Sequence, residues 1–581
     1  MNHFVRIFLF LCIATSSQAG LCEKSSNRHK QMLGDLDFIA NTFEINYAPL
    51  DWKSISFGWD LENEKLKAKS LVLGDTPISS KQFQRIIKNF CISTKDYHVV
   101  PQFYSTEWAT LPFQIQIADG RYFICHIDTQ ELGATSTSPA LSLGDEVLFF
   151  DGTPINEYVD AFRLKEVGNN YIGTDQALAE YYLTTRYGSS GHDVPQGTVE
   201  ITYKPALSND ILVQKLDWDY HLEKISDAGK LNFAKSIAPI KQSTQKDPFH
   251  KEFMTPHSKL VKSVKSFKKF DIDSSGMLGS RKSMLPPLGT VLWESEENSE
   301  FHAYLFLMDD WEVGGYVRIP SYYVDSDSAA LEFAEIIEIF QEVSDVMVID
   351  QFNNGGGLVL YLYALAAMLT DYELDVPMHR VKLTQEDVYY AIKRSKSLES
   401  IKNDRMARKK FGDTVEGVYV DYHLAICFQN AHNFIIDQWN AGNMFTDYCY
   451  LYGMEKIRPH PEVKYTKPIL ILTNSLNFSA ADFFPAIMQD NKRAKIMGSR
   501  TAGAGGYIEK VSFPNLSGIE EIDITASFSK RLDGTPIENF GVTPDIPYEI
   551  SPNDLQNNYS EYKQNILQEL RMLISERTIV K

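Results

Sequence analysis

Two apolar runs, each followed by a turn and a helical pattern, constrain the fold of this chain most strongly. The first run, "DVMVID" at 345–350, leads into the turn "NNGGG" and the helical stretch "LYLYALAAML". The second run, "KPILILT" at 467–473, leads into a helix that opens near Ser479. Runs without alternation are typical of strands buried on both faces, and strands that alternate with helices imply a mostly parallel sheet. From about residue 300 the sequence therefore predicts an α/β core with its loops gathered at the strand ends.

The two regions that precede this core have different patterns. Residues 31–98 contain short helical patterns, of which the clearest is "SSKQFQRIIKNF", with apolar residues at helical spacing behind a serine cap. Residues 110–205 change to short alternating runs separated by Gly/Asp turns, which indicates a β-rich module. Within it, "ALSLGDEVLFFDGTPI" resembles the core of PDZ-like domains, which bind peptides as an added strand at a sheet edge. An ordinary hairpin is the alternative interpretation.

Charge and cysteine spacing exclude several classes of protein. The net charge of −19 argues against a nucleic-acid-binding protein, because phosphate binding needs a concentrated basic surface. No CxxC pair is present, so no zinc ribbon is expected. The five cysteines outside the predicted signal peptide are odd in number and widely spaced, so no disulfide scaffold is expected either. The stretch "DIDSSG" imitates a calcium loop, but Ser275 and Lys282 stand where carboxylate ligands are needed. The sequence therefore predicts no metal and no cofactor.

The N-terminus has the three-part layout of a secretory signal peptide. Arg6 supplies a basic start, the block 7–14 is apolar, and Ser17 and Ala19 are small residues at the cleavage position. We expect cleavage after Ala19, although a short buried helix is an alternative. No apolar run reaches the roughly 20 residues of a membrane span, so we expect an exported protein with no stable membrane anchor.

Residues 240–290 differ in composition from the rest of the chain. They are rich in Lys, Ser, Pro and Gly, and they are basic although the protein is acidic. A run of this kind usually marks a solvated surface or a linker. Its composition favours access by proteases.

Two features of the α/β core are candidates for chemistry. The three glycines at 355–357 let the backbone come close to a ligand and turn amides outward, although such turns are often purely structural. Ser479 lies where a strand gives way to a helix, and it is either a helix cap or a nucleophile. If it is a nucleophile, the amides of Gly356 and Ala480 are placed to form an oxyanion hole.

These segments resemble the tail-specific, or carboxy-terminal processing, serine peptidases. "DVMVIDQFNNGGGL" is similar to their "DLR-x-N-x-GG" segment, and "LNFSAADFFPAIMQDNKRAKIMGSRTAGAGG" is similar to their nucleophile segment. The order of helical part, PDZ-like insert and α/β core is also that of the family. The resemblance, closest to one branch of the family, covers nearly the whole chain. It implies a secreted serine endopeptidase that hydrolyses protein substrates through an acyl-enzyme.

One departure from the family pattern bears on the mechanism. Many processing peptidases use a Ser-Lys dyad with the lysine in "T-x-G-K-G", but here Ala504 occupies that position. Alanine cannot accept a proton, so the base must come from elsewhere. The resemblance implies His98 as the base and Glu538 as the carboxylate that orients it, whereas Asp96 is expected to be structural. On residue chemistry alone, a single histidine or glutamate is more often a surface or core group.

The resemblance also bears on activation, assembly and substrates. The resemblance further implies a zymogen activated by autocatalytic cleavage, a homodimer, host proteins as substrates, and a virulence factor delivered onward into a host cell. The alternative is a non-catalytic module that binds peptides or apolar ligands on the same fold.

The expected divisions are a signal peptide (1–19), an N-terminal helical region with the catalytic histidine (20–108), a PDZ-like domain (109–206), a linker with an inhibitory, self-cleaved segment at about 240–290 (207–299), and an α/β serine protease core (300–581).

Overall fold

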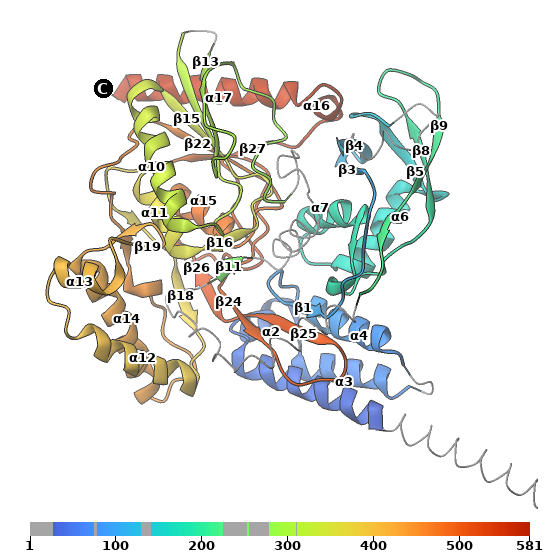
Figure 1. The fold of residues 1–581 in the computed structure, drawn as a ribbon, viewed down its shortest axis with the longest axis horizontal. Helices are drawn as coiled ribbons and strands as arrows, with labels where there is room; N and C mark the ends of the chain where they lie inside the picture. The colour runs from blue at the N-terminus through green and yellow to red at the C-terminus, as the bar shows by residue number, and fades with distance from the viewer. Residues whose placement is uncertain are drawn as a thin grey trace, which may run out of the picture.

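The computed structural model in Figure 1 describes most of the chain. The predicted signal peptide and most of the segment 240–290 lie outside the described residues. The described residues are 27–74, 78–128, 141–224, 252–254, 278–308 and 311–580.

The predicted, mostly parallel sheet is confirmed in the C-terminal half of the chain. Its seven strands lie in the order β12-β13-β14-β15-β22-β23-β27. The strands from β14 to β27 are parallel to one another, whereas β12, β13 and β14 pair antiparallel at one edge. The bounds are β12 (Thr290–Glu294), β13 (His302–Leu307), β14 (Val313–Arg318), β15 (Val346–Asp350), β22 (Ile469–Thr473), β23 (Lys495–Gly498) and β27 (Ile546–Pro547).

The central strands are apolar except at their last residues, Asp350 and Thr473, because each strand lies between two cores. All five residues of β15 and all five of β22 are buried. Met347 and Ile349 belong to the core that contains α10, α11 and α15, while Val346 and Val348 belong to the core that contains α17. Figure 1 shows these helices covering the sheet. The bounds are α10 (Ser326–Val343), α11 (Val359–Ala367), α15 (Ala480–Asp490) and α17 (Ser560–Val580).

The N-terminal region is helical, as predicted. The pattern "SSKQFQRIIKNF" forms α4, and the Ser79 hydroxyl accepts a hydrogen bond from the Gln82 amide at its start. Strand β1 then pairs with β25 from the C-terminal half, so the helical region packs directly against the α/β part. The helical region comprises a helix over residues 27–46, α2 (Leu50–Phe57), α3 (Leu61–Val72) and α4 (Ser80–Ser93), followed by β1 (Val100–Phe103), which pairs with β25 (Ile519–Thr525).

The predicted β-rich module is a sheet with the order β3-β4-β5-β8-β9. The turns expected at Gly144 and Gly152 have φ angles of 82° and 75°, which glycine adopts readily. Strand β3 lies at the edge of the sheet, and α7 packs beside it. The bounds are β3 (Phe113–Ala118), β4 (Arg121–Ile127), β5 (Glu146–Phe150), α6 (Ile155–Phe162), α7 (Ile172–Leu183), β8 (Thr198–Lys204) and β9 (Leu212–Asp217).

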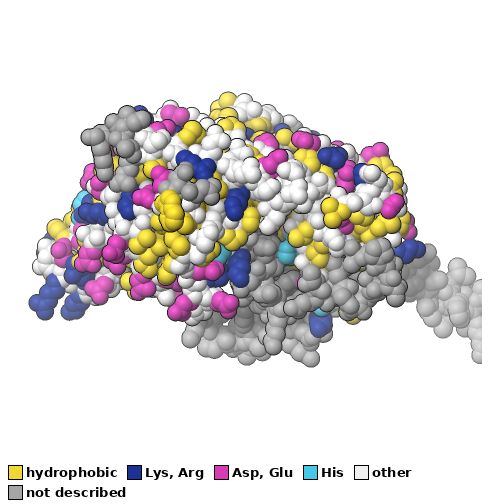
Figure 2. Space-filling view, turned by 90° about the horizontal axis from the view of Figure 1, so that it is seen from above, with side chains coloured by type: hydrophobic (Ala, Val, Ile, Leu, Met, Phe, Trp, Pro, Cys, Tyr) yellow, Lys and Arg dark blue, Asp and Glu magenta, His cyan; other side chains and the backbone are white. Residues whose placement is uncertain are grey.

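The remaining elements extend these parts. Figure 2 shows one face of the molecule, on which acidic, basic and apolar side chains are interspersed. Within the described ranges, no helix combines the length and the apolar character needed to cross a bilayer. The helical insertion beside the core comprises α12 (Gln385–Leu398), α13 (Asp404–Phe411) and α14 (Tyr422–Asn440), and further strands include β18 (Met378–Val381), β24 (Ile508–Val511) and β26 (Ser527–Lys530).

Candidate active site

Ser479 lies on the sharp corner between β22 and α15. Its backbone has φ 60° and ψ −117°, a conformation that is strained for a residue with a side chain. The residue is fully buried, and its hydroxyl has no hydrogen-bond partner among the described residues. The hydroxyl therefore does not cap α15. A strained backbone and an unpartnered hydroxyl at a helix N-terminus are features expected of a nucleophile rather than of a cap.

Asp482 fixes this corner to the segment 501–505. Its Oδ2 accepts hydrogen bonds from the amides of Ser479 (2.7 Å) and Ala504 (3.0 Å). Its Oδ1 accepts from the Thr501 hydroxyl (2.5 Å) and the Gly503 amide (2.8 Å). Burial raises the pKa of Asp482 to about 6, while these four donors oppose the shift. The carboxylate thus holds the serine corner and the 501–505 segment in one unit.

The same segment reaches Glu538. The Gly505 amide donates to Glu538 Oε2 at 2.9 Å, and the ammonium group of Lys53 donates to Oε1 at 2.5 Å. Both side chains of this ion pair are fully buried. Burial and the nearby Asp96 raise the pKa of Glu538 to about 8, while Lys53 and the Gly505 amide act to lower it. The position of Ala504 is thus used for backbone hydrogen bonds, and the lysine in this neighbourhood comes from the N-terminal helices.

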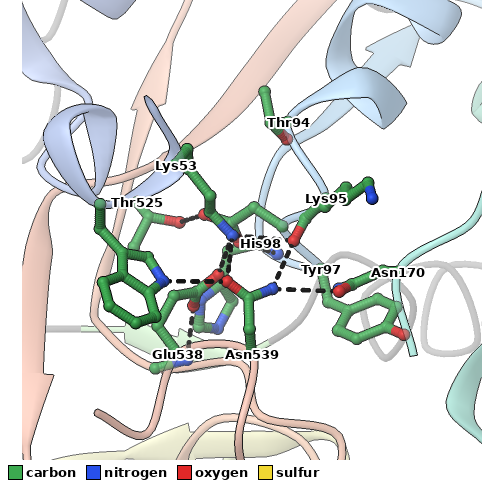
Figure 3. Close-up of polar contacts among 12 residues, drawn as sticks. Lys53, Thr94, Lys95, Tyr97, His98, Asn170, Thr525, Glu538 and Asn539 are labelled. Atoms are coloured by element: carbon green, nitrogen blue, oxygen red, sulfur yellow. Dashed lines mark hydrogen bonds and ion pairs between the residues drawn. The ribbon is translucent and has the colours of Figure 1, made fainter. Parts of the chain in front are cut away.

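Lys53 is a residue that the sequence analysis did not identify. It lies in α2, which ends at Gly58 in the left-handed conformation (φ 64°). Its Nζ also donates to the Lys95 carbonyl (2.8 Å) and to Asn539 Oδ1 (2.7 Å), as Figure 3 shows. Because the Ser479 hydroxyl has no partner, Lys53 is not hydrogen-bonded to it and does not replace the lysine of a Ser-Lys dyad here.

Asp96 and His98 follow α4, and His98 lies beside this ion pair in the close-up of Figure 3. The His98 amide donates to Asp96 Oδ1 at 2.9 Å. Asp96 Oδ2 accepts from the Tyr47 hydroxyl (3.0 Å) and the Thr525 hydroxyl (2.8 Å). These contacts are all with a backbone amide or neutral hydroxyl groups, and the structural role expected for Asp96 stays a prediction.

The structure brings the neighbourhoods of His98 and Ser479 together. The ring of Tyr97 packs edge-on against the ring of Phe478, with centroids 5.7 Å apart, and these residues immediately precede His98 and Ser479. The His98 side chain is fully buried, as are those of Ser479 and Glu538. The hydrogen bond from the Ser479 hydroxyl to His98 that an assembled triad needs is not formed in this structure. Loose geometry of this kind is common before substrate binds.

Of the glycines at 355–357, Gly356 and Gly357 begin strand β16 (Gly356–Leu358), which lies beside α15. At Gly357, where φ is 153°, a Cβ atom would lie 2.0 Å from the backbone carbon of Tyr322, so only glycine fits. The Gly356 amide donates to Asn354 Oδ1 at 2.8 Å. Ala480 is the first residue of α15, where a helix leaves amides without intrahelical partners. Of the two amides predicted for an oxyanion hole, that of Gly356 is therefore engaged in this structure.

A short strand from the predicted inhibitory segment lies on these glycines. Strand β11 (Glu252–Met254) pairs antiparallel with β16, and Phe253 is opposite Gly357 while Met254 is opposite Gly356. The added strand uses the backbone of the glycine segment, next to the helix that Ser479 begins. Within the described residues, no group of three or more His, Cys, Asp and Glu side chains is arranged to hold a metal ion.

Comparison with known proteins places this geometry in a family. The profile of peptidase family S41 matches residues 314–548, and the PDZ domain profile matches residues 107–225. An uncharacterized protein of Chlamydia muridarum is 34% identical over 606 residues, which cover 99% of this chain and 98% of that protein.

Two solved structures are similar over the same length. A serine-to-alanine mutant of CPAF is 32% identical and has a TM-score of 0.83, covering 94% of this chain and 98% of that chain. Mature CPAF complexed with lactacystin is also 32% identical, with a TM-score of 0.80 and coverage of 94% and 99%. The predicted resemblance to the chlamydial protease-like activity factor, CPAF, is confirmed. The chain belongs to peptidase family S41, as a CPAF-like serine peptidase with a PDZ domain.

Proposed function

We propose that this serine peptidase is an endopeptidase in which Ser479, His98 and Glu538 act as a catalytic triad. Ser479 Oγ attacks the scissile carbonyl carbon while His98 accepts its proton, and His98 then protonates the leaving amine. Water hydrolyses the acyl-enzyme with His98 again as the base. Glu538 orients the imidazole and stabilises its charged form, and the amides of Ala480 and the 355–357 segment bind the oxyanion.

One observation carries this proposal. The buried Ser479 hydroxyl has no partner on a strained corner, and that corner is linked through Asp482 and the 501–505 segment to Glu538. A hydroxyl that served only the fold would be hydrogen-bonded, because burial of a polar group without a partner costs about 1–3 kcal/mol. Strain and an unmet hydroxyl at the same residue are explained if a substrate completes the site.

Lys53 acts as a positioning residue in this proposal. A carboxylate stabilises an imidazolium only while it is ionised, and burial together with Asp96 disfavours the ionised form of Glu538. The ammonium group of Lys53, 2.5 Å from Glu538 Oε1, offsets part of that penalty. In this proposal Lys53 thus stabilises the ionised form of Glu538, and it does not accept the proton of Ser479.

We further propose that the described form is latent and that cleavage within 240–290 activates it. Strand β11 occupies the backbone of β16, where an extended substrate would add as a strand, and the Gly356 amide is bonded to Asn354. Removal of β11 would free the glycine segment to bind substrate and to turn an amide toward the oxyanion. Homodimerisation, secretion through residues 1–19, host proteins as substrates, a role in virulence and the predicted domain bounds are further proposals, supported by the resemblance to CPAF.

Labelling with a fluorophosphonate probe tests the nucleophile. The Ser479 oxygen is expected to displace fluoride from phosphorus in activated wild-type protein and give one labelled serine per chain. Ser479→Ala should remain unlabelled, whereas Ser475→Ala, on the same loop, should label like the wild type. An unlabelled wild-type protein would favour the non-catalytic binding module, and label on another serine would show that the nucleophile is assigned wrongly.

Mass spectrometry of purified protein tests the latency. Wild-type protein is expected to acquire new termini within 240–290 as activity rises, while Ser479→Ala should stay intact until active enzyme is added. Full activity of an uncut chain would contradict the proposed latency without affecting the triad.

A further inference from the structure

A cavity of 440 Å³ lies between the PDZ-like sheet and the α/β core. One wall is the edge strand β3 together with α7, and the opposite wall is formed by the loops that follow β15 and β22. Figure 1 shows α7 in this position between the two parts. An exposed sheet edge beside a helix is the arrangement in which a PDZ domain adds a peptide as an extra strand. The cavity therefore occupies the place of the peptide groove of a PDZ domain.

The start of β3 lacks the amides that would hold a C-terminal carboxylate. Capture of a carboxylate needs successive free backbone N–H groups. The Leu111 amide already donates to the Thr184 carbonyl at 2.9 Å, and Pro112 has no N–H group to offer. Both residues immediately precede β3. The groove is thus poorly suited to the free C-terminus of a chain.

The lining of the groove is acidic instead. Its described lining residues include three carboxylates, Asp119, Glu180 and Glu549, and no lysine or arginine. An anionic peptide terminus would be repelled by this lining. A cationic side chain would find carboxylate partners that nothing else in the lining neutralises.

Glu180 is the central member of this set. It extends from α7 to the sheet edge, where Oε1 accepts from the Ile117 amide at 3.2 Å and from Gln176 Nε2 at 3.0 Å. Glu180 is only 5% exposed. Among the described residues, its carboxylate forms no ion pair with a lysine or an arginine. Burial raises its pKa to about 8. A buried carboxylate with only neutral donors is costly, and a ligand cation would relieve that cost.

We propose that this groove binds an extended peptide segment through a lysine or arginine side chain placed against Glu180, and not through a C-terminal carboxylate. The peptide backbone pairs with the β3 edge, and its cationic side chain enters the cavity. The opposite wall includes Asn474 and Leu476, and the Thr174 hydroxyl of α7 donates to the Ser475 carbonyl at 2.8 Å. The bound segment therefore contacts the loop that leads to Ser479, which is suited to holding a polypeptide near the catalytic corner.

Fluorescence anisotropy on full-length Ser479→Ala protein tests this proposal without relying on catalysis. The probe is a labelled peptide, acetyl-Ser-Val-Thr-Lys-Val-Thr-Ser-amide, and it is compared with the same peptide carrying norleucine in place of lysine. A third peptide carries norleucine and a free C-terminal carboxylate. We expect the lysine peptide to bind at least about tenfold more tightly than either of the others, since a desolvated charge pair is lost in both.

Variants of the groove complete the test. Glu180→Gln keeps the shape of the side chain and should weaken the lysine peptide at least about tenfold while leaving the norleucine peptide unchanged. Asp119→Asn, on an exposed turn, should weaken it less, and Glu157→Gln, outside the groove, should have no effect. Thermal melts confirm that each variant is folded. Equal binding of lysine and norleucine peptides, tighter binding of the free carboxylate, or no effect of both Glu180→Gln and Asp119→Asn would overturn the proposal.

Discussion

Two buried glutamates, one in each half of the molecule, meet the same physical problem in different ways. Glu538 in the α/β part and Glu180 in the PDZ-like part are both buried, and burial raises the pKa of each to about 8. Glu538 has an ammonium group 2.5 Å away, supplied by Lys53 from another part of the chain. Glu180 has an amide from the backbone and an amide from Gln176.

The difference indicates what each carboxylate is for. A buried ion pair rarely adds net stability over an apolar packing, so an internal cation that favours the charged form of a carboxylate is most useful where the charge itself has a task. A catalytic carboxylate must be ionised before the substrate arrives. A binding carboxylate can wait for a ligand to bring the opposite charge. We interpret Glu538 as the first kind and Glu180 as the second.

The largest expected effect is a difference in kcat on a small substrate between variants of the two glutamates. Glu538→Gln removes the charge that stabilises the imidazolium while it keeps the shape, and it should lower kcat by up to about 10⁴-fold. Glu180→Gln should change kcat by less than about twofold, because it touches no reacting group. Steady-state hydrolysis of a chromogenic peptide by activated protein measures both. Equal losses of kcat in the two variants would show that the two glutamates do not differ in role. A Glu538→Gln enzyme with the kcat of the wild type would show that Glu538 is not part of the triad.

The second prediction concerns the partner of Glu538. Lys53→Met keeps the length of the side chain but leaves a buried carboxylate without its cation, which should lower the free energy of unfolding by about 3–5 kcal/mol. The loss should be smaller in the double variant Lys53→Met/Glu538→Gln, because no charge is then left unpaired. Urea unfolding of the Ser479→Ala protein with and without these changes gives the coupling energy.

A positioning role of Lys53 makes a further demand on activity. Without the ammonium group the pKa of Glu538 rises further, so the pH at which activity appears should move upward relative to the wild type. A stability loss with an unchanged pH profile of kcat/KM would leave Lys53 as a structural residue only. Lys65→Met, which breaks an exposed pair with Glu62, is the matched control and should change neither quantity appreciably.

The sequence predicted those parts of the fold that depend on local patterns. The buried strands at 345–350 and 467–473 and the serine-capped α4 follow from runs and spacings within about a dozen residues. Ser479 was identified because it lies between one of these strands and the helical stretch that follows. The assignments of His98 and Glu538 needed the resemblance to a family, since one histidine or one glutamate carries no local signal.

Other features could not be predicted because they depend on contacts between distant residues. Lys53 lies in a short helix where a lysine ordinarily faces solvent, and its partner Glu538 is 485 positions away. Strand β11 pairs through its backbone, which composition does not reveal, so the contact of the predicted inhibitory segment with the glycines of β16 could not be foreseen. The engagement of the Gly356 amide by Asn354 likewise depends on tertiary geometry.

The smallest expected effect is the change of stability with pH at Glu180. Because its folded-state pKa is raised above the usual value for a glutamate, the folded protein holds this proton more tightly than the unfolded chain does. The contribution of Glu180 to stability is therefore fully present below about pH 4 and falls as pH rises toward its folded pKa of about 8. Glutamine cannot ionise, so Glu180→Gln should gain stability over the wild type at pH 9 relative to pH 5, by roughly 1–3 kcal/mol.

Urea unfolding of the Ser479→Ala protein at the two pH values measures this difference, with Glu157→Gln as the exposed control. The gain should vanish when a saturating lysine peptide is present, because its ammonium group then stabilises the ionised carboxylate. A pH-independent difference between Glu180 and Gln, or one that the lysine peptide does not alter, would mean that the neutral donors around Glu180 already suffice, and that the two glutamates do not differ in the way their partners suggest.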